Sequence, residues 1–311
     1  MTRPAFIAIR LWNRLPVLLR AIVLAELIAD IGGLMPDLFM VANLKLSPSV
    51  PWLLPATALW LWIFWRYLDG EGWPRSTAES RRRDLRARPL SSTIWFWSLL
   101  AGGLAMVSVV SLSFLTTRLA NVPRDAFKLP IDLSHYPIWT TASVLLAISA
   151  VAGVVEEAAF RGYLVSQVER RHGWIVAILI SGVMFFVSHL GHAYVTFAFL
   201  PFFLVVSSLH GLLVYLTRSI LPSVVLHGVA DMIVIPIQYG VIGHLSVSPV
   251  WKTGMDSAFI TSAVLIVIFG ILAVPAFRRL ATITEADRGG GSQNLTQSNQ
   301  SMQPTAGRFE N

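Results

Sequence analysis

Long apolar runs dominate the chain, and they constrain its fold more than any other feature. A transmembrane helix needs about 20 consecutive, mainly apolar residues. Eight segments approach that length, at 15–36, 50–67, 93–115, 137–160, 174–190, 194–216, 220–241 and 257–277. Only 13% of the residues are charged, which is about half of what a soluble domain carries. We therefore predict an all-α fold, a polytopic bundle of about eight transmembrane helices in a lipid bilayer.

The first of these segments is the weakest candidate for a span. Arg20, Glu26 and Asp30 interrupt it, so it either crosses the bilayer or lies partly in the interface.

The chain contains no cysteine, which excludes disulfides and thiolate chemistry.

The cations of the connecting segments predict the orientation of the chain. With eight spans, one side receives Arg3, Arg10, Arg14, Arg66, Arg75, Arg81, Arg82, Arg83, Arg86, Arg88, Arg170, Arg171, Arg218, Arg278 and Arg279. The other side receives Lys45, Arg118, Arg124, Lys128 and Lys252. Positive residues favour the cytoplasmic side, so we predict a multi-pass protein of the cell membrane with both termini cytoplasmic. This bias explains the net charge of +7 without a nucleic-acid partner.

The domain organisation is simple. We predict a membrane domain over 1–283, with a motif-bearing core at 137–240. The polar segment 69–92 is expected to be a cytoplasmic loop whose arginines set the topology. Residues 284–311 are rich in Gly, Ser, Gln and Asn and are predicted to form a disordered tail.

Three ionisable residues in the fourth span are candidates for function, because charge inside a bilayer is costly unless it is paired or hydrated. Glu157 and Arg161 are four residues apart and share a helix face, so they can form an ion pair. Glu156 is rotated by about 100° from Glu157 in an α-helix and lacks that partner. Such a carboxylate suits a general base, while the simpler interpretation is a charge cluster that holds helices together.

Histidines on the later spans extend this pattern. His227 and Asp231 are four residues apart and can touch, so Asp231 is expected to orient the imidazole. His189 ends the fifth span, and His192 shares its face but lies nearer the extracytoplasmic end. His210 stands alone in the sixth span and is interpreted as a hydrogen-bond donor between helices.

A carboxylate, two imidazoles and an Asp on three apolar helices can perform two kinds of hydrolytic chemistry. They can activate water and stabilise an oxyanion directly, or they can hold a divalent metal such as zinc that does both. The His-Glu-x-x-His pair of zinc proteases and the Gly-x-Ser-x-Gly elbow of serine hydrolases are absent from the sequence.

The three motifs together resemble those of the CPBP family, the CAAX-protease and bacteriocin-processing membrane proteins. This family includes the type II CAAX prenyl endopeptidases and the lysostaphin-resistance protein A group. Its pattern is Glu-Glu-x-x-x-Arg, then Phe-x-x-x-His, then His-x-x-x-Asn or Asp. The chain carries Glu156 to Arg161, Phe185 to His189, and His227 to Asp231 in the same order and spacing.

The resemblance implies an intramembrane endopeptidase. Glu156 would be the water-activating base, His189 would hold the same water or a metal, and His227 with Asp231 would stabilise the oxyanion. Glu157, Arg161 and Phe185 would support them, and a metal such as zinc would be held by Glu156, His189 and His227. An ionised Asp231 would repel an oxyanion, so here it must be protonated, orient His227 or help to bind a metal.

Three functions follow from these residues. The first is an endopeptidase, glutamate- or metal-dependent, acting on a membrane-anchored peptide or protein near the membrane surface. The second is a non-catalytic scaffold or bacteriocin self-immunity protein, and the third is a proton-coupled transporter. Intact Glu156, His189 and His227 favour the first, and the absence of an evident internal repeat disfavours the third.

Overall fold

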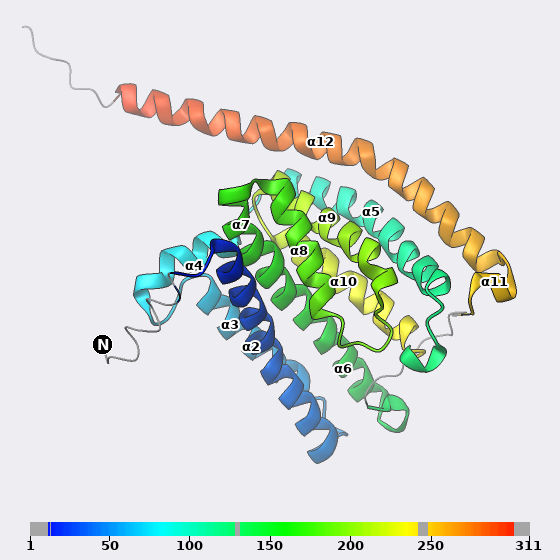
Figure 1. The fold of residues 1–311 in the computed structure, drawn as a ribbon. Helices are drawn as coiled ribbons and strands as arrows, with labels where there is room; N and C mark the ends of the chain where they lie inside the picture. The colour runs from blue at the N-terminus through cyan, green and yellow to red at the C-terminus, as the bar shows by residue number, and fades with distance from the viewer. Residues whose placement is uncertain (1–11, 13, 128–130, 242–247, 302–311) are drawn as a thin grey trace, which may run out of the picture.

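The structure, a computed structural model, describes residues 12, 14–127, 131–241 and 248–301, with side chains up to residue 288. Arg3, Arg10, Lys128 and the predicted tail beyond 301 lie outside these residues. The main helices are α2 (Val17–Leu46), α3 (Leu53–Leu68), α4 (Ala78–Leu85), α5 (Ser92–Leu119), α6 (Ile138–Val151), η4 (Ala152–Leu164), α7 (Val165–His172), α8 (Trp174–Ser188), α9 (Leu200–Thr217), α10 (Leu221–Gln238), α11 (Val250–Thr253) and α12 (Ser257–Ser301). Short 3-10 turns η1 (Arg75–Thr77), η2 (Arg124–Phe127), η3 (Leu133–His135) and η5 (Phe197–Phe199) connect them. The predicted all-α bundle is confirmed (Figure 1).

Five helical stretches of the described chain are long and apolar enough to cross a membrane. They are Ser92–Leu119, Ile138–His172, Phe197–Thr217, Leu221–Gln238 and Ser257–Arg288. The fifth predicted span forms α8, which is apolar but shorter. The first and second predicted spans form α2, which carries charges, and α3, which has 16 residues. The protein is therefore a multi-pass membrane protein, and every predicted span contains a helix.

The fourth predicted span belongs to one continuous helical stretch that changes type. It runs as the α-helix α6, becomes the π-helix η4, and returns to α-helix in α7. In a π-helix each amide donates to the carbonyl five residues earlier, as the Val165 amide does to Phe160. The α-helical rotation that we assumed for Glu156 and Glu157 therefore does not apply to this segment.

The bundle has two ends that differ in charge. One end, which we call the basic end, is formed by residues 66–92, 163–174 and 216–221. The other, the opposite end, is formed by residues 46–53, 117–127, 131–140, 189–197, 238–241 and 248–256. Contacts join the segments at each end: the Ile220 amide donates to the Arg86 carbonyl at the basic end, at 3.1 Å. At the opposite end, Arg118 Nη1 lies 2.5 Å from Asp256 Oδ1.

The segment 69–92 is more ordered than the polar loop that we predicted, because it folds as α4 and packs onto the basic end. Ser166 Oγ donates to the Asp84 carbonyl at 2.9 Å, and Arg170 Nη1 lies 2.8 Å from Asp84 Oδ1. Glu169 bridges Arg86 at 2.5 Å and Arg218 at 2.9 Å. Asp84 and Arg86 of this segment therefore fasten it to α7.

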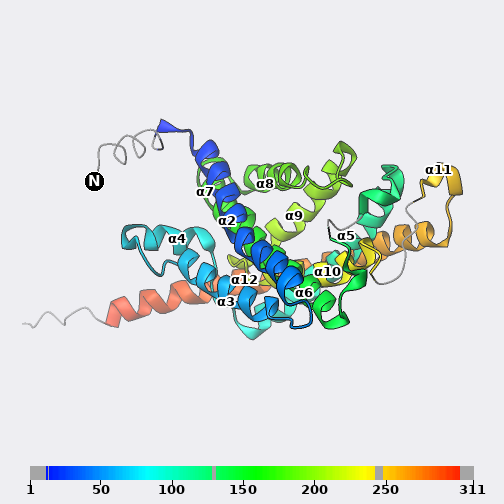
Figure 2. The same cartoon turned by 90° about the horizontal axis from the view of Figure 1, so that it is seen from below.

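The predicted start of the disordered tail, residue 284, falls inside a helix. α12 continues to Ser301 and lies along the outside of the bundle beside α5 (Figures 1 and 2). Thr284 is buried, and Arg288 Nη2 donates to the Leu216 carbonyl at 2.6 Å. The predicted boundary after residue 283 therefore falls within α12, because the polar residues at this point continue the apolar helix.

Two glycines allow η4 to approach α10 closely. A Cβ added to Gly153 would lie 2.9 Å from both the Gly228 amide nitrogen and the Val224 carbonyl oxygen. Small residues permit such backbone contact between membrane helices. This contact brings the helix of Glu156 and Glu157 next to the helix of His227.

Replacing Gly153 by alanine should destabilise the protein by about 1–3 kcal/mol, because backbone atoms cannot rotate away from the new methyl group. The change should also reduce activity by moving η4 away from α10. Gly103→Ala is the matched control, since nothing lies within 4 Å of its added Cβ. Equal melting temperatures for the two purified variants would contradict the close packing.

Candidate active site

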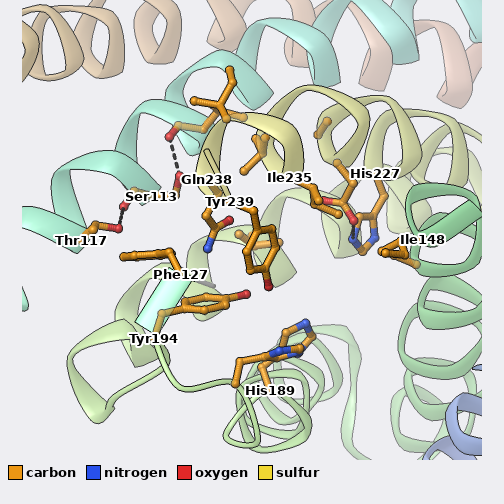
Figure 3. A pocket seen from close by; sticks show the side chains of 18 of the residues that line it. Ser113, Thr117, Phe127, Ile148, His189, Tyr194, His227, Ile235, Gln238 and Tyr239 are labelled. Carbon is orange, nitrogen blue, oxygen red and sulfur yellow. Dashed lines mark hydrogen bonds and ion pairs between the residues drawn. The ribbon is translucent and has the colours of Figure 1, made fainter. Parts of the chain in front are cut away.

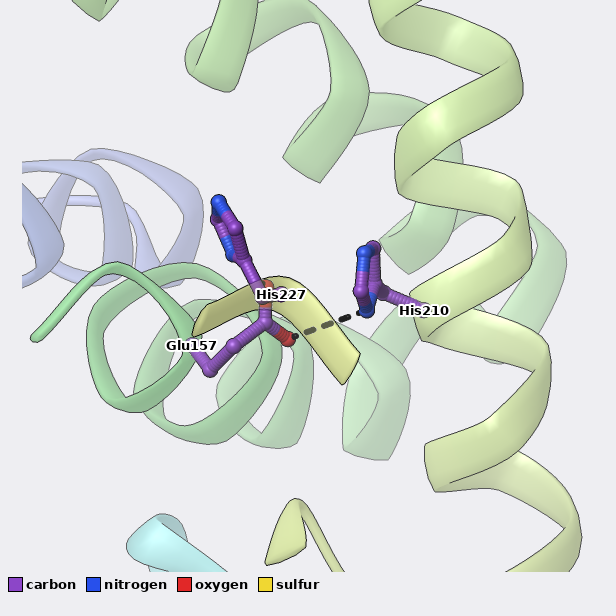
Figure 4. Close-up of side chains that lie close together, drawn as sticks. All are labelled: Glu157, His210 and His227. Atoms are coloured by element: carbon purple, nitrogen blue, oxygen red, sulfur yellow. Dashed lines mark hydrogen bonds and ion pairs between the residues drawn. The ribbon is translucent and has the colours of Figure 1, made fainter. Parts of the chain in front are cut away.

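Glu157 is the buried centre of the polar cluster. Its side chain is 0% exposed, and its Oε1 lies 3.2 Å from Arg161 Nη1, which confirms the predicted ion pair. The same oxygen lies 2.8 Å from His227 Nδ1, and Oε2 lies 3.8 Å from His210 Nδ1 (Figure 4). Glu157 thus joins η4 to α9 and α10, beyond the single pairing that we predicted.

His227 is oriented by Glu157. A carboxylate can only accept a hydrogen bond, so the 2.8 Å contact with Glu157 Oε1 places a proton on His227 Nδ1. Its Nε2 lies 3.6 Å from Glu156 Oε2 and 3.6 Å from Asp231 Oδ2. Asp231 therefore touches the imidazole, as predicted, but the nitrogen that fixes the tautomer faces Glu157.

Arg161 is held between a carboxylate and an aromatic ring. Its side chain is 0% exposed, and its guanidinium carbon lies 4.2 Å from the Phe185 ring centroid. Within the described residues, its nitrogens have the ion pair with Glu157 but no hydrogen bond of good geometry. Stacking on an aromatic face suits a buried guanidinium, so Phe185 supports the cation that balances Glu157.

Phe185 also connects Arg161 to the imidazoles. Its ring lies 4.5 Å from that of His189 and 6.0 Å from that of His227, edge to face in both cases. α8 begins at Trp174 and spans only about 22 Å at 1.5 Å per residue. This is shorter than the hydrocarbon core, which is about 30 Å thick, and His189 directly follows the last residue of α8.

His189 presents one ring nitrogen to the cavity. Its Nδ1 lies 2.7 Å from the Phe185 carbonyl oxygen, which can only accept, so Nδ1 carries the proton. The neutral ring then has an acceptor lone pair on Nε2. Figure 3 shows the ring among the side chains that line the pocket.

A cavity of about 840 Å³ brings the predicted residues together (Figure 3). Its lining includes Glu156, Phe185, His189, His227 and Asp231. The remaining wall is largely apolar and includes Met106, Val109, Phe114, Ile148, Phe199 and Phe202. The side chain of Glu156 is 25% exposed and that of Asp231 is 24% exposed, whereas Glu157 and Arg161 are fully enclosed behind them.

The charges in this cluster do not cancel when every group is ionised. Glu156, Glu157 and Asp231 supply three negative charges, against one on Arg161 and one on a protonated His227. A proton shared between Glu156 and Asp231 would cancel the excess, since both approach the same imidazole nitrogen. The arrangement can therefore hold and release a proton at a carboxylate that faces the cavity.

The residues present do not fit a divalent metal well. Ligand atoms of Glu157, His210 and His227 lie within 4.8 Å of one another, but Arg161 already supplies positive charge 3.2 Å from Glu157 Oε1. The predicted set of Glu156, His189 and His227 does not form such a ligand cluster within the described residues. The chemistry proposed below therefore depends on the protein side chains alone.

Two further histidines, His210 and His192, contribute to the cavity more than their sequence context suggested. His210 was interpreted as a solitary donor between helices, yet it lines the cavity and faces Glu157. Its position as an ionisable residue inside a span was the available signal. His192, which shares a helix face with His189 in the sequence analysis, also lines the cavity and stacks on Tyr194 at 5.5 Å between ring centroids.

Residues 138–233 match the family model described as type II CAAX prenyl endopeptidase Rce1-like. This part of the chain is therefore similar to the Rce1-like family. The matched segment extends from α6 into α10 and contains all three motifs. No curated protein and no solved structure matches the chain.

Proposed function

We propose that the protein is an intramembrane endopeptidase that hydrolyses a peptide bond of a membrane-anchored peptide or protein. One observation carries the proposal: the Glu156 carboxylate faces the cavity, 3.6 Å from His227 Nε2, while Glu157 and Arg161 support it from behind. The match of residues 138–233 to the Rce1-like family model supports the same reaction class. We further propose that the protein resides in the cell membrane with both termini cytoplasmic.

Glu156 activates the attacking water in this proposal. Its carboxylate removes one proton from the water, and the lone pair on His189 Nε2 accepts a hydrogen bond from the other hydrogen. The hydroxide oxygen then bonds to the scissile carbonyl carbon. Glu156 returns the proton to the amide nitrogen as the carbon–nitrogen bond breaks, which yields a carboxylic acid and an amine. A positioned base of this kind contributes about 10²–10⁴-fold to the rate.

His227 stabilises the tetrahedral oxyanion. Glu157 holds its Nδ1 proton, so a second proton on Nε2 points toward Asp231, Glu156 and the cavity. Donation to the oxyanion from such a fixed group is worth about 10²–10³-fold. Asp231 lies 3.6 Å from Nε2. When Glu156 is ionised and acts as the base, Asp231 holds the proton that the two carboxyl groups share, so no ionised Asp231 carboxylate faces the oxyanion.

Wild-type protein in proteoliposomes should cleave members of a membrane-anchored peptide library, and EDTA should not reduce the rate. Mass spectrometry of the products gives the cleaved bond. Cleavage that stops with EDTA and returns with zinc would replace water activation by Glu156 with metal chemistry. No cleavage with or without zinc would favour the non-catalytic scaffold.

A further inference from the structure

The lining of the cavity reaches only one end of the bundle. Its lining includes the opposite-end residues Thr117, Arg118, Phe127, Leu133, His192, Tyr194, Gln238, Tyr239 and Phe259. None of the described residues 66–92, 163–174 and 216–221, which form the basic end, contributes to the lining. The approach to Glu156 is therefore from the end of the bundle that carries few cations.

Packed side chains block the path from the basic end. Phe160 and Arg161 follow Glu156 along η4 and are 1% and 0% exposed. Leu213 follows His210 along α9, and Ile220 precedes His227 at the start of α10; both are 0% exposed. A substrate cannot reach the carboxylate through this layer unless the helices separate.

The open end has the features of a peptide entrance. Tyr194, Gln238 and Tyr239 lie together at this end of the cavity (Figure 3). The Tyr194 hydroxyl hydrogen-bonds with Gln238 and with the Tyr239 hydroxyl. An extended peptide, whose amides need partners away from water, can exchange these hydrogen bonds for bonds to its own backbone. The deeper wall, with Met106, Phe114 and Phe199, suits apolar side chains.

The positive-inside rule assigns this end to the extracytoplasmic side. Arg75, Arg81, Arg82, Arg83, Arg86, Arg88, Arg170, Arg171 and Arg218 lie at the basic end, whereas Lys45, Arg118, Arg124 and Lys252 lie at or near the opposite end. Arg118 is also neutralised there by Asp256. Cations of short loops remain in the cytoplasm, so the closed end is cytoplasmic.

We propose that the site takes its substrate from the extracytoplasmic side: a membrane-anchored peptide whose apolar, extended segment enters at the end of the cavity that Tyr194 and Tyr239 line. This inference rests on the proposed peptidase function and adds to it the side of the membrane on which the peptide is cut. The products that leave the cavity are an extracytoplasmic fragment and a shortened membrane-anchored segment.

Accessibility of single cysteines tests the proposal, because the natural chain has no cysteine. Val234→Cys lies on the cavity wall, one turn beyond Asp231. Met232→Cys lies on the same helix, is 41% exposed, and does not line the cavity. Glu79→Cys marks the basic end. Each variant is treated with a membrane-impermeant cationic methanethiosulfonate, applied to right-side-out and to inside-out membrane vesicles.

Val234→Cys should react in right-side-out vesicles roughly tenfold faster or more than Met232→Cys, because the thiolate is the reacting form and lipid suppresses it. Glu79→Cys should react only in inside-out vesicles. Modification of Val234→Cys should also abolish cleavage of the membrane-anchored peptide by blocking the entrance.

Reaction of Val234→Cys only in inside-out vesicles would overturn the extracytoplasmic entrance and leave a peptidase that cuts from the cytoplasm. A second outcome is that Val234→Cys reacts in right-side-out vesicles but the protein without the reagent never cleaves the peptide. That outcome would overturn the substrate assignment together with the proposed function. The labelling and cleavage measurements therefore distinguish the two failures.

Discussion

A Glu157→Ala variant should be produced poorly and should melt far below the wild-type protein. The change leaves the fully enclosed Arg161 without its counter-ion and His227 without the carboxylate at its Nδ1. Breaking a buried ion pair by removing one partner costs about 3–5 kcal/mol. Melting of the purified protein in detergent measures the loss, and peptide cleavage should fall with it.

A double variant separates stability from catalysis in this prediction. Replacing both members of a buried pair by apolar residues of similar volume is often neutral or stabilising. Glu157→Leu combined with Arg161→Met should therefore recover much of the melting temperature. Activity should stay low, because His227 still lacks the group that orients it. A Glu157→Ala protein as stable as wild type would show that the buried pair contributes little.

Glu156→Gln should abolish peptide cleavage and leave the melting temperature close to that of wild type. The amide keeps the size of the carboxylate but cannot accept a proton from water, so the rate should fall by about 10²–10⁴-fold or more. The side chain is 25% exposed to the cavity, and its loss removes part of the excess negative charge. Cleavage is measured on the same membrane-anchored peptides.

Asp231→Asn is the matched control, because it removes the neighbouring carboxylate that lies at the same distance from His227 Nε2. An Asn at this position occurs in the family pattern, and its amide can donate to an oxyanion. This variant should keep substantial activity. Equal loss in both variants would mean that cluster charge, and not Glu156 itself, limits the reaction. A folded Glu156→Gln protein that cleaves at the wild-type rate would remove Glu156 from the mechanism.

The helical spans and the Glu157–Arg161 pair could be predicted because both depend on local chemistry. A run of apolar residues must satisfy its backbone hydrogen bonds internally in lipid, which makes each run a helix. Residues four apart on such a helix meet whatever surrounds them. The ion pair between Glu157 and Arg161 forms even though the segment is a π-helix, a conformation that no local sequence pattern had indicated.

The roles of His210 and of the segment 69–92 could not be predicted, since they depend on residues distant in the chain. His210 faces Glu157 because α9 packs beside η4, and α4 is held at the basic end by Arg170 on α7. Likewise, a polar composition after residue 284 predicted disorder, but Thr284 is buried in the extended α12. Amino-acid composition alone does not indicate which distant helices a segment will pack against.

By itself, the sequence determined that the chain is a multi-pass helical membrane protein and which ionisable residues lie inside its spans. Hydropathy and charge act residue by residue, so the order of residues is enough to establish both. Only the tertiary structure decided that Glu157 holds His227, that Glu156 faces the cavity, and that the cavity lining reaches only the end opposite to the basic end. Those outcomes depend on how closely helices approach, as at Gly153 and Gly228, and on which end the packed side chains close.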